Sequence, residues 1–237
     1  MKYLDVDALN AIDAAAFLRV KPYPFINPAG LLTAEGHQRL IDNLPDIDVL
    51  QPNFGRKRSH GQVSHDRYNL EYSQALKTVP ATWHEFVAEL HGPDYTRFMQ
   101  RMYQRRKFHL NMHWHYTPAG CSVSPHCDAQ QKLGSHIFYL NTADEWDPEW
   151  GGQTLILDDG GRFATSSAPA FEDFDRIIES ECVGNHSTLF ARRARSWHGV
   201  RELTCPEGKF RKVFIVVINH PLLYAGRQAL NWIKKKQ

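Results

Sequence analysis

Residues 108–116 read Phe108-His109-Leu110-Asn111-Met112-His113-Trp114-His115-Tyr116 and decide the fold. Apolar and polar side chains alternate along this stretch with a period of two, which is typical of a β-strand that packs one face against a core. Thr117-Pro118-Ala119-Gly120 then supplies the residues of a turn. We therefore expect a strand followed by a sharp change of direction.

Further strand-like segments follow at short intervals, at residues 136–141, 154–157, 187–190 and 213–218. Turn residues separate them, including Asp158-Asp159-Gly160-Gly161 and Glu207-Gly208, and no helical pattern comes between them. This order favours an antiparallel sandwich or jelly roll over a parallel sheet.

The N-terminal part has helical periodicity instead. We expect helices over 8–20, from an N-cap at Thr33 to Leu44 before Pro45, from Pro80 to about 90, and over 95–104. Residues 46–70 are aperiodic and predict a long loop or hairpin that faces substrate. The expected fold is mainly β with flanking helices (α+β). One domain spans 1–237, with helical support and a loop in 1–106, a double-stranded β-helix (jelly roll) core in 107–220 and a C-terminal helix in 221–237.

Composition limits the functional classes. The 237 residues are 42% hydrophobic and 23% charged, with a formal net charge of +2, which is too small to indicate nucleic acid binding. The four cysteines form no CxxC pair, so neither a zinc knuckle nor a disulfide framework is predicted. No signal peptide or membrane-spanning segment is recognisable, and we expect a cytoplasmic protein.

Two short motifs carry the chemistry, Ser124-Pro125-His126-Cys127-Asp128 and Trp197-His198-Gly199-Val200. Alternate residues of a strand share a face, so His126 and Asp128 can point to one place, where a distant strand would deliver His198. Two histidines and one carboxylate are the ligands of non-heme Fe(II) sites that activate oxygen. A His-x-Asp pattern alone is weak evidence in a chain with 13 histidines and 26 acidic residues.

The stretch from about Leu110 to Asn219 resembles the prolyl 4-hydroxylase-type branch of the Fe(II)/2-oxoglutarate-dependent oxygenases. The matching motifs, in order, are Tyr116-Thr117-Pro118-Ala119-Gly120, His126-Cys127-Asp128, Phe138-Tyr139-Leu140-Asn141, Trp146, Gly151-Gly152-Gln153-Thr154-Leu155, Trp197-His198-Gly199-Val200 and Arg211.

The resemblance implies a role for each matching residue. His126, Asp128 and His198 would bind Fe(II). Arg211 would pair with the distal carboxylate of 2-oxoglutarate, Tyr139 would donate a hydrogen bond to it, and Tyr116 would line the cosubstrate site.

The position of Arg211 departs from the family pattern. It lies thirteen residues after His198, a wider gap than is usual in the family, and Lys212 and Lys209 are alternatives. The period of two favours Arg211, because an inward Lys212 would bring bulky Phe214 into the cosubstrate pocket.

The reaction implied is hydroxylation of a C–H bond in a small molecule or a peptide side chain, with O2 consumed, succinate and CO2 released, and ascorbate as an optional reductant. An acidic residue at Asp128 favours hydroxylation over halogenation, because the halogenases of the family have a small non-ligating residue there. Residues 46–70 and 161–181 are the loops expected to contact the substrate. We expect neither a nucleic acid nor a membrane partner.

Two alternatives stay open at this point. One is a non-enzymatic jelly-roll protein that binds a metal or ligand, as cupins do; His113 and His115 resemble a cupin pair, although no glutamate follows them. The other is a nucleic-acid demethylase of the same superfamily, suggested by the basic clusters Arg56-Lys57-Arg58 and Arg105-Arg106-Lys107.

Overall fold

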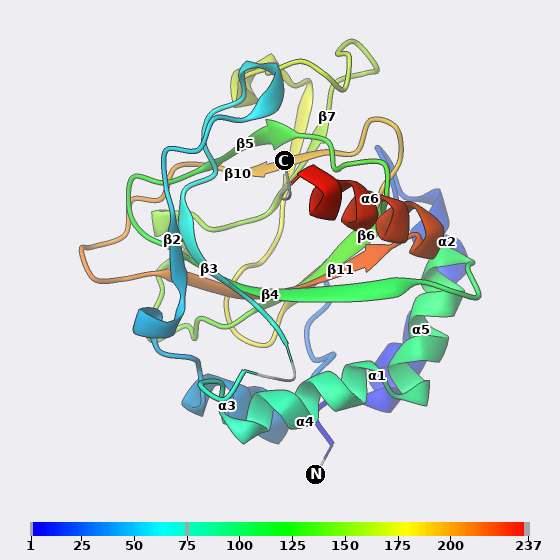
Figure 1. Cartoon of the computed structure of the whole chain (residues 1–237), viewed down its shortest axis with the longest axis vertical. Helices are drawn as coiled ribbons and strands as arrows, with labels where there is room; N and C mark the ends of the chain where they lie inside the picture. The colour runs from blue at the N-terminus through cyan, green and yellow to red at the C-terminus, as the bar shows by residue number, and fades with distance from the viewer. Residues whose placement is uncertain (1, 74–75, 235–237) are drawn as a thin grey trace.

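The computed structural model describes residues 2–73 and 76–234, and within them two antiparallel sheets face each other (Figure 1). The larger sheet has the order β1-β9-β6-β11-β4-β3-β2 and the smaller one the order β5-β10-β7-β8. The strands of the larger sheet are β1 (Phe25–Ile26), β9 (Ser187–Ala191), β6 (Lys132–Tyr139), β11 (Arg211–Asn219), β4 (His109–Thr117), β3 (Arg67–Glu71) and β2 (Gln51–Asn53). Those of the smaller sheet are β5 (Val123–His126), β10 (Trp197–Val200), β7 (Leu155–Asp158) and β8 (Arg176–Glu179). The expected mainly β jelly-roll architecture with flanking helices is confirmed.

The alternation of residues 108–116 determines which way β4 faces. Met112, Trp114 and Tyr116 are buried among residues of the helices, whereas His113 and His115 face the smaller sheet and line a cavity. β11 pairs with β4 along its whole length, from Arg211 opposite Thr117 to Asn219 opposite His109. The longest ladder of the fold therefore separates an apolar core from a polar cavity.

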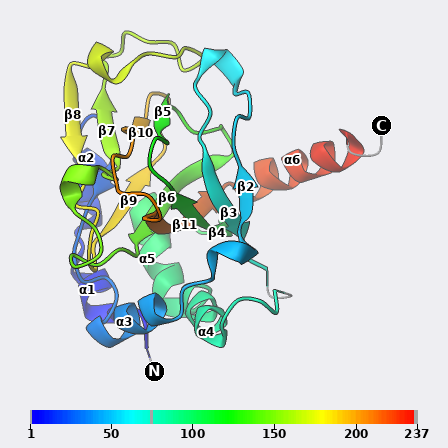
Figure 2. The same ribbon diagram turned by 90° about the vertical axis from the view of Figure 1, so that its left-hand side faces the viewer.

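The N-terminal helices cover the outer face of the larger sheet (Figures 1 and 2). They are α1 (Val6–Ala11), α2 (Ala14–Arg19), α3 (Ala34–Asp42), α4 (Ala81–Leu90) and α5 (Pro93–Tyr103). The expected single helix over 8–20 is wrong: Asp13 interrupts it, because its carboxylate accepts hydrogen bonds from the backbone N–H groups of Ala15 and Ala16 and caps a new helix. The N-cap at Thr33 is confirmed.

Residues 46–70 form a short 3-10 turn (Ile47–Val49), β2, a long connection and most of β3. β2, the connection and β3, which together span residues 51–71, are called the hairpin below. Figure 2 shows this connection at the same end of the molecule as the loop after β7. The side-chain amide of Gln62 donates to the carbonyl oxygen of Ser167 at 3.4 Å and joins the two. The segment 161–181, expected as a loop, includes the edge strand β8.

The C-terminal helix α6 (Pro221–Lys234) projects away from the body of the fold (Figure 2), and the expected end of this helix, 235–237, lies outside the described residues. No helix in the part of the chain described here combines the length and the apolar character that crossing a bilayer requires.

One buried histidine gives the fold a pH dependence. His136 of β6 is inaccessible to solvent and shares a hydrogen bond with the Tyr95 hydroxyl at 3.0 Å, and burial lowers its pKa to about 3. An unfolded histidine titrates near pH 6.5, so between these values the unfolded chain binds a proton that the native state does not.

We expect the free energy of unfolding to fall as the pH decreases from about 6 to about 4, and His136→Phe to make that fall shallower by about one proton, or about 1.4 kcal/mol per pH unit. Urea denaturation at a series of pH values measures both slopes. Parallel curves for the variant and the wild type would contradict the prediction.

Candidate active site

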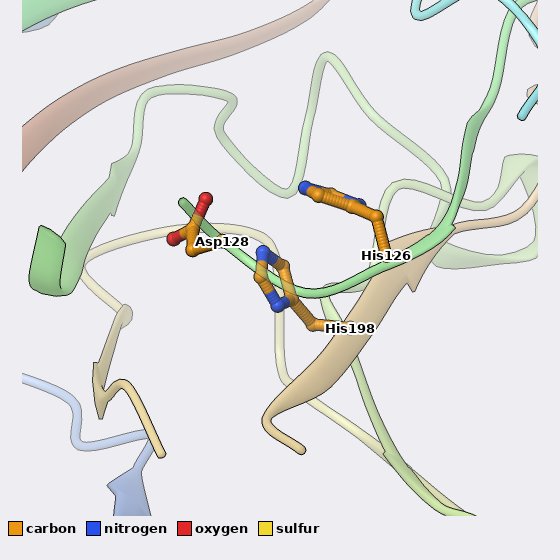
Figure 3. Close-up of side chains that lie close together, drawn as sticks. All are labelled: His126, Asp128 and His198. Atoms are coloured by element: carbon orange, nitrogen blue, oxygen red, sulfur yellow. The ribbon is translucent and has the colours of Figure 1, made fainter. Parts of the chain in front are cut away.

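Three side chains, those of His126, Asp128 and His198, lie close together (Figure 3). His126 is the last residue of β5 and pairs directly with His198 of β10. Asp128 lies two residues beyond the end of β5, so an irregular segment rather than a continuing strand brings it to the two histidines. The ligand atoms of the three residues all lie within 4.8 Å of one another.

The hydrogen bonds of the two imidazoles leave one nitrogen of each ring available. The Nδ1–H of His126 donates to the carbonyl oxygen of Ser124, and that of His198 to the carbonyl oxygen of Ser196, both at 2.9 Å. The Nε2 atoms then carry the lone pairs that a metal requires.

The carboxylate of Asp128 completes the group. Its Oδ1 accepts a hydrogen bond from the Lys132 ammonium at 2.6 Å, while Oδ2 is buried without a hydrogen-bond partner. An unsatisfied buried carboxylate oxygen beside two imidazole lone pairs fits a divalent cation, and this donor set fits Fe(II).

Charge states at neutral pH also suit a metal. Burial lowers the pKa of both His126 and His198, which keeps the imidazoles neutral. Burial alone would raise the pKa of Asp128, but the Lys132 ammonium and the adjacent His198 outweigh it and hold the pKa below its ordinary range. The site thus presents two neutral imidazoles and one carboxylate, the forms in which these groups bind metals.

A cavity of about 810 Å³ opens beside these residues. Its walls come from both sheets and from the hairpin, and His113, His115 and His65 lie among them. His65 contacts His126 with ring centroids 4.7 Å apart, and burial together with the charges of Arg58 and Arg67 lowers its pKa to about 3. Sequence reasoning missed His65, because nothing in the aperiodic stretch around it marks a position next to the candidate metal site.

Arg211 enters the same cavity from the first position of β11. It is 6% exposed, its Nε–H donates to the carbonyl oxygen of Gly152 at 2.6 Å, and its Nη2 lies 3.4 Å from the Thr154 hydroxyl. Gly152 has a φ of +102°, and a Cβ there would approach the Arg211 side chain to 3.3 Å. The Gly-Gly motif therefore makes room for this guanidinium.

The two alternative lysines lie elsewhere. Lys212 points to the opposite face of the strand, with its ammonium 3.8 Å from Glu145, and Lys209 is exposed in the preceding turn. Among the described residues that line the cavity, Arg211 is present, and neither Lys212 nor Lys209 is.

The structure places the two tyrosines in different surroundings. The Tyr139 hydroxyl lies 2.8 to 2.9 Å from three hydroxyls, those of Thr154, Ser180 and Thr188, beneath the Arg211 guanidinium. The structure does not bring Tyr116 to the cavity. Its hydroxyl donates to the carbonyl oxygen of Pro45 in the helix-facing core, because Tyr116 alternates with the cavity-facing His115 and Thr117.

Comparison with known proteins agrees with this geometry. A family model described as the 2OG-Fe(II) oxygenase superfamily matches residues 102–218. A comparison with curated protein sequences found no match.

Solved structures with a similar fold include a Pseudomonas putida prolyl-4-hydroxylase at 17% identity, with a TM-score of 0.60 over 87% of this chain and 98% of that one. Another is a Trichoplax adhaerens prolyl hydroxylase in complex with a hypoxia inducible factor peptide fragment, at 12% identity and a TM-score of 0.58 over 90% of both chains. A third is the carbocyclase SnoK from nogalamycin biosynthesis, at 10% identity and a TM-score of 0.60 over 89% of this chain and 85% of that one.

At these identities the solved structures establish the fold, and the family model supplies the assignment. The assignment argues against the non-enzymatic jelly-roll alternative. The chain belongs to the 2OG-Fe(II) oxygenase superfamily and is a dioxygenase that uses Fe(II), 2-oxoglutarate and O2.

Proposed function

We propose that this chain hydroxylates a C–H bond of a small molecule or a peptide side chain, with Fe(II) held by His126, Asp128 and His198. The observation that carries the proposal is the buried donor group, within 4.8 Å, at the wall of a cavity that Arg211 also enters. Fe(II) together with 2-oxoglutarate supplies the oxidising chemistry, with succinate and CO2 as the coproducts.

Hydrogen bonds within the site hold the metal ligands in fixed orientations. The hydrogen bonds from His126 and His198 to backbone carbonyls fix both rings, and Lys132 fixes the carboxylate of Asp128. Rigid ligands of this kind keep a metal in one geometry while other groups exchange.

We assign the distal carboxylate of 2-oxoglutarate to Arg211. Its Nε is held by Gly152, and its Nη2 lies near the Thr154 hydroxyl, so the planar fork can face a carboxylate. We assign Tyr139 to the same subsite as a positioning residue, because its hydroxyl contacts Thr154 and its ring lies under the guanidinium, 5.6 Å from the ring centroid to Cζ.

The size of the cavity and the fold neighbours support the substrate class. A volume of about 810 Å³ is within the usual range for small-molecule sites and leaves room beside the cosubstrate for a metabolite or one side chain. The similar structures include one with a bound peptide fragment and one enzyme of nogalamycin biosynthesis.

Succinate formation from 2-oxoglutarate, measured with purified protein, Fe(II) and ascorbate, tests the proposal. We expect iron-dependent succinate in the wild type and its loss in His198→Ala, whereas His91→Ala, at the exposed end of α4, retains it. Binding of Fe(II) and 2-oxoglutarate is measured on the same samples, so that a missing substrate is not mistaken for a missing site. Equal iron-dependent turnover in His198→Ala, or a wild type that binds neither Fe(II) nor 2-oxoglutarate, would overturn the proposal.

A further inference from the structure

The charges that line the cavity are unbalanced. Among its described lining residues there are two carboxylates, Asp128 and Glu71, and six permanent cations: Arg58, Arg67, Lys132, Arg192, Arg211 and Arg227. Several of the cations have partners in the protein. Lys132 and Arg192 donate to the side chain and the backbone carbonyl of Asp128, and Arg211 is held by Gly152.

Arg58 and Arg67 of the hairpin lack such compensation. No ion pair joins either guanidinium to a carboxylate within the residues that the structure describes. Nη1 of Arg67 donates to the carbonyl oxygen of His65 at 2.8 Å, while its Nε is buried without a partner. Arg58 makes one long hydrogen bond, 3.4 Å, to the amide oxygen of Gln62.

The two acidic side chains that neighbour Arg67 in the sequence or on β3 make other contacts. Asp66, next to Arg67 in the chain, accepts hydrogen bonds from the backbone N–H of Gly55 and from the Ser64 hydroxyl. Glu71 is exposed, accepts from Asn111, and lies four residues farther along β3 than Arg67, about 13 Å away at the usual rise of a strand. Neither carboxylate forms an ion pair with the guanidiniums; the charge of Asp66 acts on Arg67, and that of Asp128 on Arg58, only at longer range.

The two arginines also repel each other. Burial, followed by the charge of Arg58, lowers the pKa of Arg67 to about 10, and both guanidiniums act on His65. Holding two half-buried cations close together without an ion-paired anion is unfavourable, and an anion bound between them would relieve both the desolvation and the repulsion.

This pair is separate from Arg211. Thr117 of β4 pairs with Arg211, and the β3–β4 ladder ends at Tyr68 opposite Tyr116, so that extending its register by one residue sets Arg67 beside Thr117. Two strand spacings therefore separate the backbone of Arg67 from that of Arg211, roughly 10 Å across the sheet. The charges of both guanidiniums act on His65, whose ring packs on that of His126 with centroids 4.7 Å apart, so the pair lies near the candidate metal ligands.

We propose that Arg58 and Arg67 bind an anionic group of the substrate, a carboxylate or a phosphate, so that the substrate is a negatively charged small molecule. The inference rests on the proposed function and names its substrate class. Asn69, and Asn53 opposite Arg67, add neutral polar groups to the same wall, which suits a hydrophilic metabolite better than an apolar one.

The test measures anion binding to the full-length protein loaded anaerobically with Fe(II) and saturating 2-oxoglutarate, so that no turnover occurs. Sulfate, as a tetrahedral stand-in for a phosphate ester, and acetate are titrated separately by calorimetry. We expect one of them to bind, with an affinity about tenfold weaker in Arg67→Gln and in Arg58→Gln, since a charged hydrogen-bond partner is lost. Tighter sulfate binding indicates a phosphate ester, and tighter acetate binding a carboxylate.

Two control variants make the result specific. Arg56→Gln removes the same charge from an exposed position on the hairpin and is expected to leave the affinity within about twofold. Arg67→Lys keeps the charge and is expected to recover part of the affinity. Unchanged binding of Fe(II) and 2-oxoglutarate in each variant verifies that the site is folded.

Equal weakening in Arg56→Gln, unchanged affinity in Arg67→Gln, or no binding of either anion to the loaded wild type would overturn the proposal. A failure of the proposed function is distinguishable, because the wild type would then bind neither Fe(II) nor 2-oxoglutarate. In that case the anion titration can still be made on the metal-free protein.

Discussion

Asp128→Asn is expected to abolish iron-dependent turnover, lowering succinate formation by more than about a hundredfold, and to weaken Fe(II) binding by at least that factor. Asparagine keeps the shape of the side chain but removes the charge that balances the cation. It also leaves the Lys132 ammonium, 2.6 Å from Oδ1, without its anion, so the site gains net positive charge just where a dication must enter.

The measurement is Fe(II) affinity by anaerobic titration, followed by succinate formation at saturating iron. Asp144→Asn, which removes a carboxylate from an exposed loop position, serves as the control and is expected to behave as wild type. Full activity of Asp128→Asn at ordinary iron concentrations would show that this carboxylate is not a metal ligand.

Arg211→Gln is expected to raise the KM for 2-oxoglutarate by about a hundredfold while Fe(II) affinity changes little. Removing one partner of a buried, charge-assisted pair has an effect of this size. A raised KM for 2-oxoglutarate with an unchanged Fe(II) affinity identifies a residue that anchors the cosubstrate. A residue that only supports the fold would affect both quantities, because general destabilisation weakens both binding sites.

Neighbouring residues supply the controls for this variant. Lys212→Gln removes a cation one position along, on the opposite face of β11, and is expected to leave the KM unchanged. Arg211→Lys retains charge without the planar fork and should recover only part of the affinity. A hundredfold effect in Lys212→Gln and none in Arg211→Gln would transfer the anchoring role to Lys212.

Much of the core could be predicted because apolar and polar residues alternate along β4, and this local pattern determines which side chains face the core. The same signal places Tyr116 correctly: it lies between His115 and Thr117, which face the cavity, so its own side chain must face the helices. The expectation that Tyr116 lines the cosubstrate site came from the resemblance and overrode this local evidence. Tyr139 is an intermediate case, since it reaches the neighbourhood of Arg211 but its hydroxyl contacts Thr154.

Other features depend on contacts between distant segments and leave no mark in the local pattern. His65 and Arg67 gain their importance only when the hairpin lies beside β4 and β5. Lys132 pairs with Asp128 across a turn, and no periodic pattern in the sequence predicts this contact. The break at Asp13, by contrast, could have been foreseen, since an aspartate inside a short helical pattern is a strong N-cap candidate.

The cavity draws its walls from two kinds of chain segment. His126, His198 and Arg211 lie on paired strands, whereas Arg58 and His65 belong to an aperiodic connection. Contacts such as that of Gln62 with Ser167 join this connection to the rest of the rim. Mutations in that connection alter one wall of the cavity without disturbing the hydrogen bonds between the strands. During evolution the substrate of such a protein can therefore change while its metal and cosubstrate sites are conserved.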